Sequence, residues 1–261
     1  MKLAFLCTAD LWKNLAVSIL IVLLTGSPAT AQVNEPDIAE LRKELERVKT
    51  AADLTDAVRA MAEQALKQAI EQVELTEQWH SKADEFSAAR KQAPAMLKNL
   101  AVDLDKPLVE VALAVPDGVT LSDMEQLLEQ AESELDIARN TAAQLDAEKL
   151  RRAARRLELP KLLTDAGMRL NAAEDMLKDT PPSNQSPALV SALKALNLAR
   201  TATIQMERQA LQNELASYEA RGGLLKARLQ MADRQIAMHE RLVAFWNQQV
   251  NKERSREAEE A

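Results

Sequence analysis

Apolar residues recur at alternating spacings of three and four over most of residues 192–250, and this periodicity constrains the fold more than any other feature. A repeat of 3.5 residues is the heptad pattern of helices that pack together as a coiled coil. Such a stripe drifts against the 3.6-residue turn of a straight helix, so it keeps facing one neighbour only where helices supercoil. Since an isolated helix would leave the stripe in water, the pattern predicts partner helices. From residue 211 the stripe comprises Leu211, Leu215, Tyr218, Gly222, Leu225, Leu229, Ala232, Ile236, His239, Val243, Trp246 and Val250.

Two other segments repeat this spacing and supply the expected partners. The first stripe comprises Ile38, Leu41, Leu45, Val48, Ala52 and Thr55, then Ala62, Leu66, Ala69, Val73, Thr76, His80 and Ala83, with Arg59 between the two sets. The second comprises Leu121, Met124, Leu128, Ala131, Leu135, Ala138, Ala142 and Leu145, then, after an interruption, Leu163, Ala166, Leu170, Ala173 and Leu177. Three matched stripes predict an all-α fold, an elongated antiparallel three-arm coiled-coil helical bundle. We expect residues 32–261 to form one domain with arms at about 36–92, 121–179 and 187–258.

Prolines predict the limits of the first arm. Pro36 suits the first turn of a helix, where a missing N–H is tolerated, and we expect this helix to end before Pro94. Residues 93–120 are the least regular part of the chain. Within them, residues 108–115 are apolar and β-like in composition. This segment either folds against the end of the bundle or stays exposed as a partner-binding patch.

The second and third arms carry their own start signals. Ser122 and Glu125 have the spacing of a capping box, in which each side chain binds a backbone N–H of the other residue. Residues 180–187 form the clearest loop, and there Ser186 is the expected N-cap and Pro187 the first helical residue of the third arm.

Two features interrupt these later arms. Pro160 disfavours helical geometry at Leu159 and predicts a kink or a one-turn break. Gly222 and Gly223 lie inside the third arm, where two glycines cost roughly 2 kcal/mol relative to alanine. They indicate either a flexible joint or the close approach of a neighbouring backbone.

The composition excludes several classes of protein. With 3% aromatic residues and 5 glycines, the chain does not resemble a compact mixed fold. Its net charge of −7 disfavours nucleic-acid binding, which needs a basic face. We interpret the one dense basic cluster as a solvated face paired with acidic neighbours. The cluster comprises Arg151, Arg152, Arg155 and Arg156.

Residues 1–31 are typical of a secretory signal peptide. Lys2 and Lys13 bracket the n-region, residues 15–24 form the apolar segment, and small residues lead up to Ala31. We expect cleavage after Ala31 and export to the periplasm, with an uncleaved inner-membrane anchor as the alternative. The single cysteine, Cys7, lies in this segment, so the exported chain has no thiol for a disulfide or a metal site.

The remaining chain offers little chemistry. It contains two histidines, no cysteine and no glycine-rich phosphate loop, so we expect no enzyme, no catalytic, cofactor-binding or metal site, and no small-molecule substrate. His80 and His239 both fall on the stripes, and the first and third arms of a three-arm antiparallel bundle run parallel. The two residues would then lie at similar heights, either as a pH-sensitive pair or, as we prefer, as separate residues at the core edge.

Several runs resemble one known family. They are LSDMEQLLEQA at 121–131, followed by Leu135, Arg139, Leu145 and Pro160, and LQNELASYEARGGLLKAR at 211–228. Together they resemble the periplasmic porin-like domain of the long, potassium-efflux-type channels of the small-conductance mechanosensitive (MscS) family, over roughly residues 35–255. Two positions depart from the family's pattern. The family often has Arg-Pro in place of Leu159-Pro160, and a proline after the serine in place of Tyr218-Glu219.

The resemblance implies a non-enzymatic periplasmic helical module that is structural or regulatory to a mechanosensitive channel. Its implied partners are channel or other membrane-protein subunits of the inner membrane, and self-association into a homo-oligomer is left open. The pore-forming part of such channels does not follow in these 261 residues. We therefore expect either the periplasmic piece of a truncated or split channel gene or a free-standing module. The alternative function is an independent periplasmic coiled-coil protein with a binding, chaperone-like or envelope-spacer role.

Overall fold

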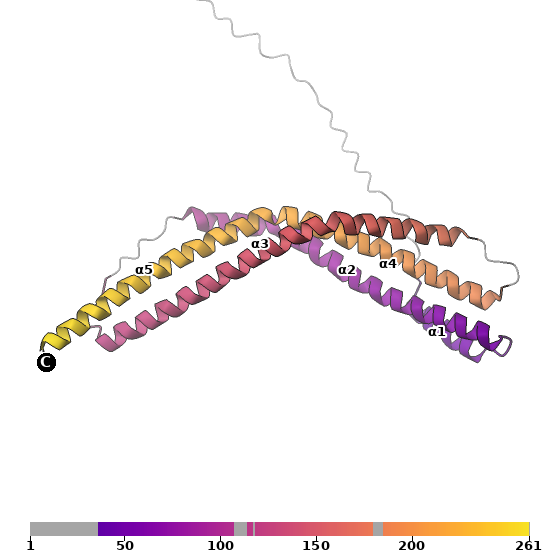
Figure 1. Ribbon diagram of the computed structural model, residues 1–261, viewed down its shortest axis with the longest axis horizontal. Coiled ribbons are helices and arrows are strands. Elements are labelled where there is room, and N and C mark those ends of the chain that lie inside the picture. Colours follow the sequence, from indigo (N-terminus) through magenta and orange to yellow (C-terminus); the bar gives the residue numbers. More distant parts are fainter. Residues whose placement is uncertain (1–35, 107–113, 117, 180–184, 261) are drawn as a thin grey trace, which may run out of the picture. The chain divides into compact units, whose positions relative to one another are not determined.

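The computed structural model describes residues 36–106, 114–116, 118–179 and 185–260. Over these residues the protein consists of helices and their connections, without strands, which confirms the predicted all-α bundle. The helices are α1 (Ile38–Thr50), α2 (Asp56–Asp105), α3 (Leu121–Lys178), α4 (Pro187–Ala220) and α5 (Gly222–Glu260) (Figure 1). The expected signal peptide at residues 1–31, residues 108–113 of the apolar segment and most of the loop at 180–187 lie outside the described residues. None of the helices described is both long and apolar enough to span a membrane.

Side-chain bonds set the direction of α2 against α4 and α5. α2 packs along both of these helices, and its residues bond to residues about 130 positions later in the chain. The offset holds from one end of α2 to the other, so α2 runs parallel to α4 and α5. The bonded pairs are Gln68 with Arg200, Ala83 with Asn213, and Leu104 with Arg234.

α3 runs in the opposite direction and packs against α4 and α5 (Figure 1). Ion pairs join early residues of α3 to late residues of α5, and late residues of α3 to α4. These pairs are Glu125 with Arg254, Arg139 with Glu240, and Arg169 with Glu207. The expected order of three arms, with the first and third parallel and the second antiparallel, is therefore present in the described helices.

The first arm is not one helix, and the prediction of a continuous helix over 36–92 was wrong. α1 ends at Thr50, and α2 begins at Asp56 with Thr55 as its N-cap. α1 folds back along α2, and Arg42 forms an ion pair with Glu74 at 3.4 Å. The Arg59 guanidinium donates to two carbonyl oxygens of the turn, those of Ala51 at 2.9 Å and Leu54 at 3.2 Å. Arg59, the charged residue between the two sets of the first stripe, thus closes this turn.

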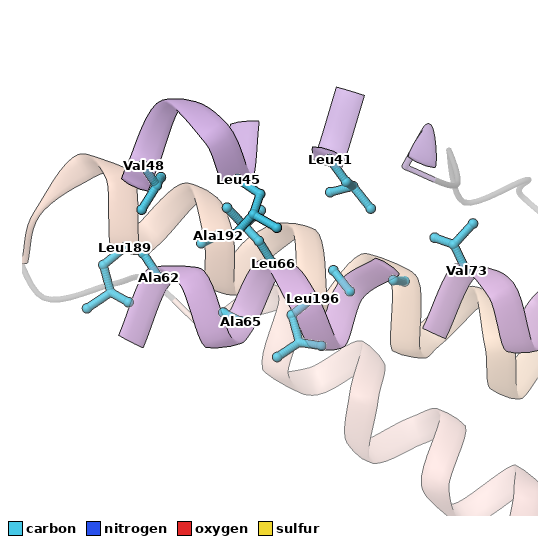
Figure 2. Close-up of a cluster of buried hydrophobic side chains, with 12 residues drawn as sticks. Leu41, Leu45, Val48, Ala62, Ala65, Leu66, Val73, Leu189, Ala192 and Leu196 are labelled. Carbon is cyan, nitrogen blue, oxygen red and sulfur yellow. The ribbon is translucent and has the colours of Figure 1, made fainter. Parts of the chain in front are cut away.

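The main core lies where α1, α2 and α4 meet (Figure 2). Small side chains dominate the α2–α4 contact, which lets the two helices approach closely because alanine projects little from the backbone. Inside this contact the hydroxyls of Thr76 and Thr203 bond at 3.0 Å, so each polar group has a partner. The buried residues of the core are Leu41, Leu45, Val48, Ala62, Ala65, Leu66, Ala69, Val73, Leu189, Ala192, Leu196 and Ala199.

α2 continues past Pro94 to Asp105, so the expected end before Pro94 was wrong. A proline inside a helix costs about 3 kcal/mol because it removes a backbone hydrogen bond. Tertiary contacts on both sides of Pro94 offset this cost. Ala93 is fully buried. Arg234 of α5 donates to the carbonyl oxygens of Leu104 and Lys106, which lack partners within the helix.

α3 also differs from its expected boundary features. Its N-cap is Thr120, which forms a capping box with Asp123, instead of the expected Ser122 with Glu125. The helix is continuous through Pro160, so the one-turn break that we weighed there is not observed. At the start of α4, Ser186 is the N-cap and Pro187 the first helical residue, as expected, although the Ser186 side chain makes no capping bond.

We predict that Leu159→Ala lowers the free energy of unfolding by about 2 to 5 kcal/mol, because Leu159 is 0% exposed and packs with Leu211 and Tyr218. Ile137→Ala is the matched control, since Ile137 is 63% exposed on the same helix, and its effect should stay within roughly 0.5 kcal/mol. Urea denaturation followed by circular dichroism measures both. Equal effects would contradict the packing described for α3.

Candidate functional site: a polar layer and an outer stripe on α3

The gap in the apolar stripe of α3 is a polar layer that faces inward. Counting from Leu145 at spacings of three and four, the inner positions are Glu148, Arg152, Arg155 and Leu159. All four are partly or fully buried. The stripe is therefore continuous in space, and its middle is charged instead of apolar.

The centre of this layer is an ion pair between α3 and α4. Arg155 donates to both carboxylate oxygens of Glu214, from Nε to Oε1 at 2.9 Å and from Nη2 to Oε2 at 3.1 Å. The Glu214 side chain is 8% exposed, and the Tyr218 hydroxyl donates to the same carboxylate at 2.9 Å. Phe86 of α2 packs edge-on against the Tyr218 ring, with the two ring centres 6.3 Å apart. The hydrogen bonds to Glu214 raise the pKa of Arg155, so this guanidinium stays charged.

A second acidic group holds the neighbouring arginines. Glu148 accepts from Arg152 Nε at 2.5 Å and from Arg151 Nε at 2.7 Å. Burial alone raises the pKa of Glu148, but the bonds from these two arginines outweigh it and the pKa lies below its ordinary value. Arg152 and Arg155 thus face inward, and the Arg152 side chain is only 12% exposed. Pairing with acidic neighbours is confirmed for Arg151, Arg152 and Arg155, whereas a solvated face was wrong for Arg152.

A hollow of about 190 Å³ opens beside this layer, where α4 gives way to α5. Three guanidinium groups line it, together with aliphatic side chains from α2 and α5. Arg221, at the junction, lies with its guanidinium 5.6 Å from the centre of the Tyr218 ring, and that of Arg152 lies 5.7 Å from it. The lining residues are Ala89, Gln92, Met96, Arg152, Arg221, Leu224, Leu225 and Arg228.

The paired glycines lie at the same junction. Nothing lies within 4 Å of a Cβ placed on Gly222, whereas a Cβ on Gly223 would meet the Leu97 side chain at 3.2 Å. The expected close approach is therefore to a side chain of α2 and not to a backbone. α4 ends at Ala220 and α5 begins at Gly222, which fits the alternative of a joint at Arg221. Beyond the joint the buried residues of α5 are Leu224, Ala227, Ala232 and Val250. Ala232 and Val250 lie on the expected stripe, whereas Leu225 and Leu229 of that stripe are half-buried.

The two histidines of the stripes lie apart. His239 faces Glu134 of α3, with Nδ1 and Oε2 3.3 Å apart. His80 faces Asp84 on its own helix and lies beside α4, near residue 210, by the offset of about 130. The expectation of similar heights was wrong. Among the described residues, no group of three His, Cys, Asp or Glu side chains is placed to hold a metal ion.

The opposite face of α3 carries a second stripe with heptad spacing, here called the outer stripe. All its residues are exposed, and Leu150 is 71% and Met168 62% exposed. Single exposed apolar residues are ordinary, but a row at heptad spacing is typical of a helix that pairs with another helix. The outer stripe comprises Ala143, Ala147, Leu150, Ala154, Leu157, Lys161, Thr164 and Met168.

Neither the inward polar layer nor the outer stripe was predicted from the sequence, although the sequence contains a signal for the outer stripe. Leu150 and Leu157 are seven residues apart, with Ala154 between them at a heptad position. The second arm thus carries two stripes on opposite faces, and the outer one spans the interruption of the inner one. Glu214, by contrast, sits off the apolar stripe of its own helix, and nothing in its neighbourhood marks it as the partner of Arg155.

Comparison with protein-family models identifies the chain. Residues 44–261 match the model of the mechanosensitive ion channel porin domain. The chain belongs to this family. The resemblance inferred from residues 121–131 and 211–228 is thus confirmed, and the family is associated with channels and is not an enzyme family. Comparison with curated proteins and with solved structures gave no significant match.

We predict that the Tyr218 hydroxyl titrates above its ordinary pKa of about 10, because burial and the Glu214 carboxylate both disfavour the phenolate. The folded-state pKa is raised, so the stability that Tyr218 contributes is present below pH 10 and is lost as the pH rises through the raised value. Tyr218 is the single tyrosine of the chain, so phenolate absorbance reports it alone. Glu214→Gln should lower the midpoint, and an unchanged midpoint would contradict the bond.

Proposed function

We propose that the protein is a non-enzymatic periplasmic helical module of a mechanosensitive channel system, with a structural or regulatory role. Membership of the porin-domain family supports the association with a channel. The apparent signal peptide at residues 1–31 supports the periplasmic location. The family match also favours this function over an independent chaperone-like or spacer protein.

The exposed outer stripe of α3 is the structural feature that supports a specific mode of action. Its apolar residues are exposed, whereas α3 uses its other face against α4 and α5. We propose that the outer stripe packs against the same stripe of a second copy, so that two modules pair beside the channel. Contact along such a stripe would remove Leu150 and Leu157 from water. This burial would stabilise the pair by about 25 cal/mol for each Å² of apolar surface buried.

Charge complementarity favours a second copy as the occupant. Arg151 and Glu158 flank the outer stripe on the same side, seven residues apart. In an antiparallel pair centred between Ala154 and Leu157, Arg151 of one copy lies beside Glu158 of the other, and the symmetry of the pair repeats this contact. Ala153 and Gly167 flank the other side and leave room for the partner helix.

We predict that the purified protein self-associates and that Leu157→Glu makes it monomeric, because a charge replaces the centre of the apolar contact. Met61→Glu is the matched control, since Met61 is 56% exposed on α2, away from the outer stripe, and this variant should associate like the parent. Sedimentation velocity measures both. Arg151→Glu should also weaken association, and Arg151→Glu combined with Glu158→Arg should restore it. A parent protein that stays monomeric at high concentration would overturn the self-pairing.

A separate prediction concerns the location. A reporter fused after residues 1–31 should reach the periplasm and be cut after Ala31. Replacing residues of the apolar segment 15–24 with charged ones should leave the reporter in the cytoplasm, because the segment could no longer enter the export pathway. Accumulation of an uncut fusion in the inner membrane would support the anchor alternative instead.

A further inference from the structure

We propose that the hollow at the α4–α5 junction binds a phosphate group whose oxygens are held by Arg152, Arg221 and Arg228. None of these arginines belongs to the outer stripe. The hollow brings together three guanidinium groups from α3, the junction and α5. Guanidinium groups present several N–H donors in a planar fork, which suits the oxygens of a phosphate.

The first argument is an unused donor. Arg152 Nε is held by Glu148, but Nη1 is shielded from solvent and has no hydrogen-bond partner among the described residues. A buried donor without a partner destabilises the fold, so it requires an explanation. A small rotation of the Arg152 guanidinium would bring Nη1 to a phosphate oxygen in the hollow that Arg152 lines, and this oxygen would be the missing acceptor.

The second argument is the local charge. Burial and the nearby positive charge of Arg152 lower the pKa of Arg221, which means that the two guanidiniums disfavour each other at this distance. The acidic groups that face them are Glu148, already shared by two arginines, and Glu85. Arg228, on the hollow's rim, adds a further positive charge. The hollow is therefore positive within a chain whose net charge is −7, and the protein as a whole does not attract anions.

The third argument is the form of the hollow. Its volume of about 190 Å³ far exceeds the roughly 10 to 15 Å³ that one water molecule needs. Met96, Leu224 and Leu225 form an apolar wall beside the arginines. This wall suits the first carbons of an organic phosphate. The ligand is thus a phosphate group on an aliphatic stem, either a soluble phosphate ester or the headgroup of an anionic lipid.

Isothermal titration calorimetry with inorganic phosphate and with hexyl phosphate tests this site on the purified protein. We expect both to bind, and hexyl phosphate more tightly because its stem covers Leu224 and Leu225. Arg228→Gln should weaken the binding of hexyl phosphate on the order of tenfold, the usual effect of losing one charge-assisted bond. Arg228 is exposed, so its replacement leaves the fold intact. Arg241→Gln is the matched control, since it removes the same charge from an exposed position of α5 outside the hollow, and it should leave binding unchanged.

Vesicles distinguish the two sources of the phosphate. Binding to phosphatidylcholine vesicles that contain phosphatidic acid, lost in Arg228→Gln, would identify a lipid headgroup. Binding of the soluble probes alone would identify a soluble ester. Either result supports the site. Absence of binding by both soluble probes would overturn it, and so would equal weakening by Arg241→Gln and Arg228→Gln, because binding would then follow the general charge of the surface.

Discussion

The bidentate ion pair between Arg155 and Glu214 sets the position of α3 along α4. Apolar heptad contacts tolerate a slip of one heptad, because leucines and alanines replace one another with little change. A buried carboxylate does not tolerate it, since a slip would leave Glu214 without its arginine and expose the fold to a penalty of several kcal/mol. The polar layer therefore selects one register, as single polar residues do in other helical assemblies. The remaining cross-helix bonds, from Glu125–Arg254 to Arg169–Glu207, follow from that register.

The same layer explains why α3 has two working faces. On its inner face, charged residues take the place of apolar ones at three positions of the stripe. Leu150 and Leu157 of the outer stripe lie at the same level of the helix. One helix thus joins a specific contact inside the molecule to an apolar surface outside it. A change in the packing of the outer stripe would act on the helix that carries Arg152 and Arg155, and through them on the hollow beside Arg221.

The sequence predicted the helices and their directions because heptad spacing reports buried faces directly. It did not predict the turn at 51–55, because the stripe resumes in phase after it, even though Thr55 is a recognisable N-cap. The passage of α2 through Pro94 also escaped prediction, since the compensating bonds come from Arg234, about 130 residues later in the chain. The polar layer was visible only as an interruption. Whether such a gap is solvated or paired depends on the facing helix, and local patterns do not contain that information.

The weak points of the three long arms gather in one zone. Pro94 lies three residues from Leu97, whose side chain leaves little room for a Cβ on Gly223. Leu159, next to Pro160, packs with Leu211 and Tyr218 of α4. Near this height the prolines deprive α2 and α3 of a backbone hydrogen bond each, and the third arm has two glycines and the break between α4 and α5. The segments on either side are unbroken helix. The bending stiffness of a helical bundle is lowest at the level where every helix is weakened. A load applied to either end of the module would therefore concentrate its deformation in this zone, at the level of the polar layer and the hollow.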